Sequence, residues 1–103
     1  MKYMIRIQVS VEAGKVIDEL PGGPGPFVKR LVDRFKPESV YISPSHRELF
    51  LVAELGPADV AELMIAGATY SGNYPEFVPV VTVDEFPAIV AKALPAALKL
   101  VRG

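Results

Sequence analysis

The chain has 103 residues, of which 50% are hydrophobic and 22% are charged. This length and composition are typical of a globular protein and exclude a disordered chain, so we expect one domain over residues 1–103. Eleven Lys and Arg residues stand against twelve Asp and Glu residues, a formal charge of −1. The charge balance therefore favours neither nucleic acid nor an anionic membrane as a partner.

The chain contains no cysteine and one histidine, His46. Disulfides, thiolate catalysis and cysteine-ligated metal sites are therefore excluded, and we expect neither a metal nor a cofactor. The first ten residues alternate polar and apolar and lack the apolar core of a signal peptide. Lys92, Pro95 and Lys99 interrupt the hydrophobic tract 86–103, which falls short of the roughly 20 apolar residues that span a membrane. We expect a cytoplasmic protein with no membrane partner.

The first third of the chain predicts a strand followed by two short helices. Alternating apolar residues between positions 3 and 9 are typical of a strand. Apolar residues at helical spacing predict a helix over about 11–20, although the letters EAGK also suit a hairpin turn. After a glycine-rich and proline-rich stretch, Phe27, Leu31 and Phe35 follow one another at intervals of four and predict a second helix, ended by Pro37.

The segments SVYIS and ELFLVAEL predict a β-hairpin whose turn is PSHR. Residues opposed across a hairpin share a face of the sheet, so the turn fixes the whole register. The expected pairs are Ser43 with Glu48, Ile42 with Leu49, Tyr41 with Phe50, and Val40 with Leu51.

The second half predicts a helix, an edge strand and a final helix. The segment GPADVAELMIAG suits a helix that starts at Pro57 and is closed by Gly67, followed by a loop TYSGNY. Pro79 cannot donate a ladder hydrogen bond, so EFVPVVT is expected at a sheet edge. Asp84 is expected to cap the last helix, which Pro95 should kink or divide. A wide apolar stripe predicts that this helix is packed against the domain.

This order of elements matches the ferredoxin-like βαββαβ motif, an α+β fold with a four-stranded antiparallel sheet, here with an added C-terminal helix. In that topology the first and third strands are central and the helices cover one face. The other face is too apolar to be left in water, so we expect a homodimer through this sheet face. The residues expected on it are Met4, Arg6, Gln8, Tyr41, Phe50, Val52, Glu54, Val78 and Val80.

A resemblance that runs over nearly the whole chain is carried by the segments MKYMIRIQV, PESVYISPSHRELFLVAEL and YPEFVPVVTVDEF. The chain resembles the dimeric α+β-barrel superfamily of ferredoxin-like proteins, most of all its short single-domain members. The resemblance implies a face-to-face dimer of sheets, a cavity between sheet and helices, and a role such as that of a cofactor-independent isomerase or monooxygenase. No catalytic motif of those enzymes matches a position here.

The glycines and prolines of residues 22–26 allow three interpretations. The backbone amides of Phe27 and Val28, with Lys29 and Arg30 nearby, could face an anion at a helix N-terminus. The stretch has neither the Walker nor the dinucleotide-binding glycine spacing, which weakens that interpretation. A lid hinge is the second interpretation. We favour the third, a break that sets two short helices at an angle.

The candidate site residues are few. On the bare face, Glu54 is a candidate general base and Arg6 a candidate anion holder, although an Arg6–Glu54 ion pair in the dimer interface would account for both. His46 is a weaker catalytic candidate, since a turn histidine is most simply a solvated residue. Tyrosines near the fourth strand offer hydroxyl groups to a ligand or seal the core. The candidate ligand-binding residues are Arg6, Gln8, Tyr41, Glu54, Tyr70 and Tyr74.

Two functions remain open from the sequence. One is small-molecule binding or cofactor-independent catalysis in the cavity; the other is a non-catalytic interaction or regulatory module whose apolar sheet face only dimerises. RNA binding is disfavoured because the third strand carries one phenylalanine and two glutamates where closely spaced aromatics are needed. An acylphosphatase-like activity is disfavoured because SVEAGK contains no arginine for phosphate.

Overall fold

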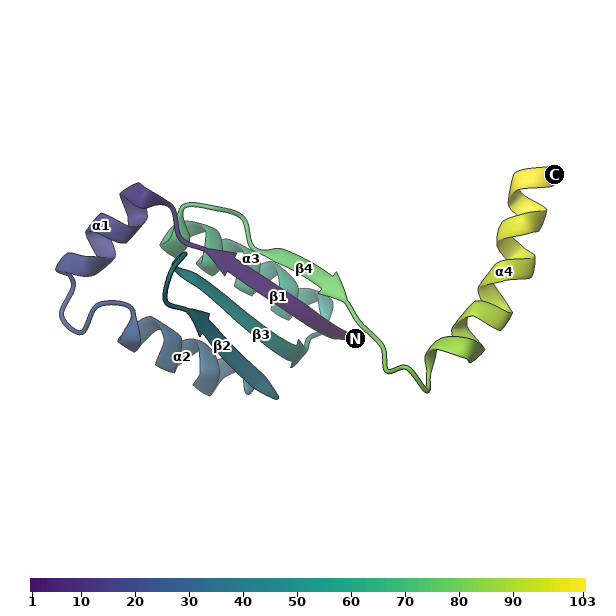
Figure 1. Cartoon of the computed structure of the whole chain (residues 1–103), viewed down its shortest axis with the longest axis horizontal. Coiled ribbons are helices and arrows are strands. Elements are labelled where there is room, and N and C mark those ends of the chain that lie inside the picture. Colours follow the sequence, from purple (N-terminus) through teal and green to yellow (C-terminus); the bar gives the residue numbers. More distant parts are fainter.

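The strands form where period-two alternation predicts them. The computed structural model describes all 103 residues and has four helices and a four-stranded antiparallel sheet, an α+β architecture (Figure 1). The strands are β1 (Lys2–Gln8), β2 (Ser39–Ser43), β3 (Glu48–Glu54) and β4 (Glu76–Pro79). Their order across the sheet is β2-β3-β1-β4. The first and third strands are therefore central, and the proline-containing β4 lies at an edge, as predicted.

The predicted hairpin register is confirmed at all four positions. Ser43 pairs with Glu48, Ile42 with Leu49, Tyr41 with Phe50, and Val40 with Leu51. Burial alternates along β3: Leu49, Leu51 and Ala53 are buried, and the residues between them are partly exposed. One face of the sheet is thus apolar and covered, and the other is open.

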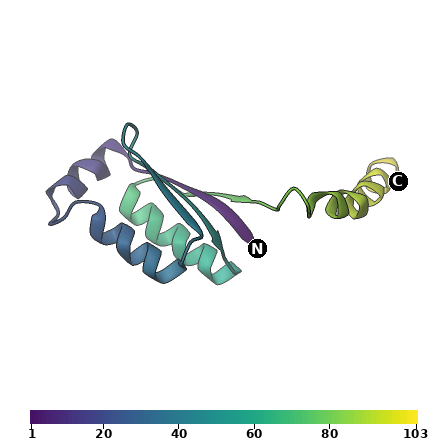
Figure 2. The same ribbon diagram turned by 60° about the horizontal axis from the view of Figure 1, so that its bottom comes forward.

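Three helices cover the same face of the sheet (Figure 2). They are α1 (Val11–Glu19), α2 (Gly25–Phe35) and α3 (Pro57–Ser71). Ser10 caps α1 by accepting a hydrogen bond from the Ala13 amide at 3.1 Å, so the segment EAGK is helical and not a hairpin turn. The core lies between this layer and the sheet; its buried members are Ile5, Ile7, Leu31, Leu49, Leu51, Ala53, Leu55 and Leu63.

The prediction that Gly67 closes the third helix is wrong. Helix α3 continues to Ser71 and ends at Gly72, whose φ of 80° is the left-handed conformation that glycine adopts freely. Gly67 is instead buried inside the helix, where a Cβ atom would lie 2.6 Å from the Pro75 ring. This glycine therefore allows the chain leading into β4 to pack directly on α3.

The final helix, α4 (Phe86–Arg102), forms as predicted but does not pack on the domain. It projects away from the sheet beyond β4 (Figure 1), and none of its residues is buried. The radius of gyration is accordingly 17.3 Å, where a compact chain of this length has about 13 Å. The expectation of a packed helix is wrong for the single chain. An apolar stripe predicts that a helix will be covered, but it does not identify the surface that covers it.

The cap of α4 also differs from the prediction. Asp84 makes no capping hydrogen bond; instead Thr82 and Glu85 form a reciprocal pair. The Thr82 hydroxyl accepts from the Glu85 amide at 3.2 Å, and the Glu85 carboxylate accepts from the Thr82 amide at 3.1 Å. Pro95 lies within the helix without dividing it. None of the helices has the length and apolar composition needed to cross a bilayer.

Replacing Gly67 with Ala should destabilise the protein. The added methyl group would overlap the Pro75 ring, and overpacking of this kind costs about 1–3 kcal/mol. The matched control is Gly25→Ala, since a Cβ at Gly25 meets no atom within 4 Å. Urea unfolding measures both variants, and a Gly67→Ala protein as stable as the wild type would contradict the proposed packing role.

Candidate ligand-binding site

A pocket lies between the sheet and the helices, at the end of the sheet where the hairpin turns. Its volume is about 340 Å³, within the range of small-molecule sites. The lining comes from β1, α1, the glycine–proline stretch, α2, the hairpin and α3, and is mainly apolar. The apolar residues that matter most are Ile7, Ile17, Phe27, Val28, Ile42 and Leu49, and the polar ones are Asp18, Ser43, Arg47, Glu48 and Tyr70.

The glycine–proline stretch forms part of this pocket wall. Gly22 and Gly23 adopt φ values of 80° and 58°, which permit the tight reversal between α1 and α2. Pro24 lines the pocket, and its carbonyl accepts a hydrogen bond from the Val28 amide at 3.1 Å. Because that amide is already used, the structure favours the interpretation as a break between helices over the anion loop. A lid hinge stays a prediction.

Arg47 and Asp18 clamp the hairpin turn to α1. The guanidinium binds both carboxylate oxygens, at 2.9 and 2.7 Å, and also donates to the Gly14 carbonyl at 3.3 Å. These bonds hold Arg47 in the left-handed region at φ 52°, an uncommon conformation outside glycine. The guanidinium keeps the pKa of Asp18 below its ordinary value. Sequence reasoning missed this pair, because residues so far apart in the chain form no local motif.

Tyr70 contributes a hydroxyl group without a hydrogen-bond partner. The hydroxyl oxygen is buried, and the ring stacks on Phe27 with 3.9 Å between centroids. Burial raises the pKa of Tyr70, an effect that the positive charge of Arg30 partly opposes, so the hydroxyl stays protonated at neutral pH. A buried unsatisfied hydroxyl costs about 1–3 kcal/mol. Tyr70 thus places an unsatisfied hydroxyl group in the pocket wall.

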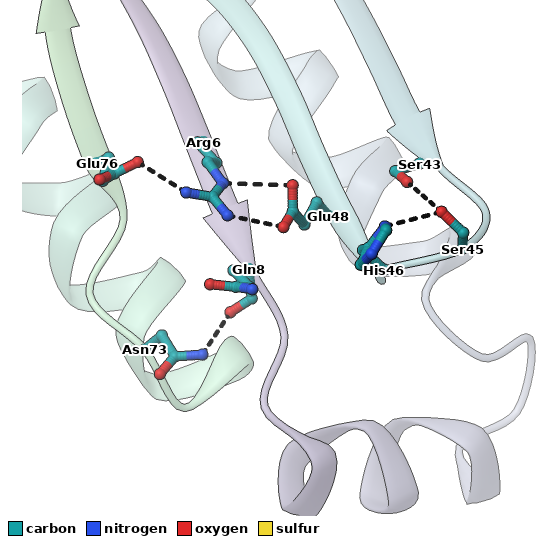
Figure 3. A network of polar contacts seen from close by, with 8 residues as sticks. All are labelled: Arg6, Gln8, Ser43, Ser45, His46, Glu48, Asn73 and Glu76. Carbon is teal, nitrogen blue, oxygen red and sulfur yellow. Dashed lines mark hydrogen bonds and ion pairs between the residues drawn. The ribbon is translucent and has the colours of Figure 1, made fainter.

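The open face of the sheet carries a separate charged network around Arg6 (Figure 3). The Arg6 guanidinium donates to both oxygens of Glu48, at 2.8 and 3.3 Å, and to Glu76 at 3.2 Å. The Glu48 side chain is only 11% exposed, and Arg6 lowers the pKa of its carboxyl group. The Arg6 guanidinium is therefore already hydrogen-bonded to two carboxylates, which leaves it poorly placed to hold an anionic substrate.

Arg6 and Glu54 form no ion pair within the chain. The register places Glu54 opposite Lys2 and Arg6 opposite Phe50, so the two residues are about 13 Å apart along the strands at roughly 3.3 Å per residue. Glu54 instead accepts a hydrogen bond from the amino group of Met1 at 2.6 Å, and its side chain is 71% exposed. The burial on which its role as a general base depends is missing.

The other candidates divide between different places. Gln8 and Tyr74 lie with Arg6 around a shallow polar hollow on the open face, where the Asn73 side chain donates to the Gln8 carbonyl at 2.9 Å. Tyr41 is exposed on β2, away from that hollow. His46 lies on the hairpin turn, exposed, with Nδ1 2.8 Å from the Ser45 hydroxyl (Figure 3), as a solvated residue should be.

Of the six candidate ligand residues, the structure brings Arg6, Gln8 and Tyr74 together and puts only Tyr70 in the apolar pocket. Comparison of the chain with protein-family models, curated proteins and solved structures found no match. The geometry of the pocket therefore carries the functional argument by itself.

Replacing Tyr70 with Phe should leave the ligand-free protein more stable, by about 1 kcal/mol. The variant keeps the ring that stacks on Phe27 and removes a buried hydroxyl that has no partner. Tyr74→Phe is the control, since Tyr74 is 79% exposed and its hydroxyl is solvated. Urea unfolding at neutral pH compares the three proteins; a less stable Tyr70→Phe would show that the hydroxyl has a partner after all.

Replacing Glu48 with Gln should lower stability at neutral pH and have little effect in acid. Arg6 depresses the pKa of Glu48 in the folded protein, so the stabilisation is complete above the ordinary pKa of glutamate and is lost as pH falls through the depressed value. The difference in unfolding free energy between wild type and variant should therefore shrink between neutral pH and about pH 3.

Glu19→Gln, at an exposed position of α1 without an ion pair, controls for the loss of one charge. A difference for Glu48→Gln that is the same at both pH values would contradict the ion-pair explanation.

Proposed function

We propose that this protein binds a small, uncharged and largely apolar molecule in the pocket between its sheet and its helices. The observation that carries the proposal is the pocket itself, about 340 Å³ in volume, walled by apolar side chains and bordered by a few polar groups. That combination is typical of sites that recognise one small ligand.

The electrostatics of the pocket support an uncharged ligand. Arg47 and Asp18 neutralise each other through two hydrogen bonds, so neither offers a free charge. The Glu48 carboxylate at the pocket is likewise held by Arg6, and the remaining polar groups are the Ser43 hydroxyl, which is hydrogen-bonded to Ser45, and the buried Tyr70 hydroxyl. A ligand group that reached the Tyr70 hydroxyl and hydrogen-bonded to it would recover the cost of its buried, unpaired state.

A binding role has better support than catalysis. A cofactor-independent isomerase or monooxygenase needs a proton acceptor beside its substrate. The carboxylates at the pocket are Asp18 and Glu48, and Arg47 and Arg6 hold their respective pKa values below the ordinary ones, which makes both weak bases. Glu54 and His46 lie outside the pocket.

The fold proposal goes with this function. Central first and third strands, an edge fourth strand and helices on one face support a ferredoxin-like arrangement. The open face, apolar over much of its area, supports a homodimer of the kind found in the dimeric α+β-barrel superfamily. The rival function, an interaction module with no ligand, shares this dimer and differs only at the pocket.

A thermal-shift screen tests the proposal. Uncharged aromatic and alicyclic metabolites should stabilise the protein, by about 2.7 kcal/mol at roughly 100 times the dissociation constant, and their carboxylate counterparts should not. Val28→Phe should abolish the shift by filling the pocket, whereas Lys29→Phe adds comparable bulk on the exposed side of α2 and should preserve it.

A broad panel without any shift would favour the interaction module. A shift that survives Val28→Phe would place the ligand elsewhere.

A further inference from the structure

Helix α4 presents an apolar surface that nothing in its own chain covers. Its large hydrophobic side chains recur at helical spacing along one broad side, while Lys92, Lys99 and Ala88 lie on the other. All of them are exposed to solvent. The members of this apolar side are Phe86, Ile89, Val90, Leu94, Leu98 and Val101. A free helix of this kind signals an interaction surface.

The open face of the sheet has charged residues at both ends and an apolar part between them. Arg6, Glu48 and Glu76 form a charged network at one end, and Lys2 lies opposite Glu54 at the other. In the next row Val52, Met4 and Val78 lie side by side on three strands, and Tyr41 and Phe50 flank them. Met4, Tyr41, Phe50 and Val52 border a shallow hollow here. We define the apolar patch as Met4, Tyr41, Phe50, Val52, Val78 and Val80.

The link between β4 and α4 directs the helix away from its own patch. The Val80 amide donates to the Lys2 carbonyl at 2.9 Å, which fixes the chain to the sheet edge up to that residue. Two residues later the reciprocal bonds of Thr82 and Glu85 begin the turn that sets the helix direction. Little free chain is left to reverse the helix, so a covering surface must come from another molecule.

The charge distribution favours a second copy of this chain as that molecule. Helix α4 carries Lys92, Lys99 and Arg102 and no acidic residue. Residues 1–85 carry all twelve acidic residues against eight basic ones, a formal charge of −4. The basic helix of one copy is therefore attracted to the acidic body of another; an anionic membrane would also attract the helix but would repel the body.

We propose that α4 of one copy docks on the apolar patch of a second copy, and that a two-fold axis makes the exchange reciprocal. The proposal rests on the homodimer of the proposed function, but here the partner's α4, and not the partner's sheet, covers the open face. One isologous contact then covers both unpartnered surfaces of each chain. The ligand pocket lies on the opposite side of the sheet and takes no part in the exchange.

Single cysteines test this directly, because the natural chain has none. Leu94→Cys and Val52→Cys are purified separately, mixed, and treated with a short bismaleimide at low protein concentration. The mixture should give a covalent heterodimer of the two variants. Ala88→Cys mixed with Val52→Cys is the matched control and should give at least tenfold less product, because Ala88 lies on the basic side of α4.

Sedimentation equilibrium gives the second readout. Leu94→Glu should weaken dimerisation at least tenfold, while Ala88→Glu, with the same change of charge, should leave it unchanged. Neither substitution touches the core, since α4 buries no residue within its own chain.

Other outcomes would overturn the proposal in distinguishable ways. Crosslinking within one chain of a Val52→Cys/Leu94→Cys double variant, without heterodimer from the single variants, would show that α4 folds back on its own sheet. A dimer insensitive to Leu94→Glu would leave the proposed homodimer standing and exclude α4 as its cover. A monomer that binds vesicles of phosphatidylcholine and phosphatidylserine through α4 would exclude both.

Discussion

The rest of the structure depends on one constraint, the burial of a single face of an antiparallel sheet. On β1 and β3, Ile5, Ile7, Leu49 and Leu51 point to the same side and bring α2 and α3 with them into one core. A one-residue slip between these strands would move that whole set to the open side. The position of the pocket beneath the sheet and of the uncovered patch above it both follow from this alternation.

The two faces of the sheet differ in what covers them. The covered face stabilises the chain and, near the hairpin turn, leaves a pocket that Arg47 and Asp18 close on one side. The open face carries its charges at its two ends, where Arg6 is bound by Glu48 and Glu76 and where Lys2 and Glu54 are paired with Glu38 and the Met1 amino group. Because the charges neutralise one another locally, the remaining apolar surface is free to meet a helix. The proposed ligand binding and the proposed assembly would therefore use opposite sides of one sheet.

Local patterns predicted local structure well and long-range contacts poorly. The hairpin register was predictable because a short turn fixes every pair after it, and Pro79 at an edge followed from its missing amide hydrogen. The role of Gly67 was not predictable, because the sequence does not distinguish a glycine that ends a helix from one that allows a neighbouring residue, here Pro75, to pack closely. The distance between Arg6 and Glu54 depends on the register of β1 with β3, which the sequence alone does not fix. Nothing in the sequence joins Arg47 to Asp18 or indicates where α4 packs.

The attachment of α1 has a consequence for access to the pocket. At its start, the Ser10 amide donates to the Ser71 carbonyl at 2.8 Å, and further along Asp18 is held by Arg47. No residue of α1 belongs to the eight-residue core. Swinging this helix outward would break the bond to Ser71 and the bonds of Arg47 to Gly14 and Asp18, and would expose Ile17, while the sheet and the other helices stay assembled. We therefore expect that, if the pocket opens, α1 is the element that moves and the glycines that follow it are the hinge.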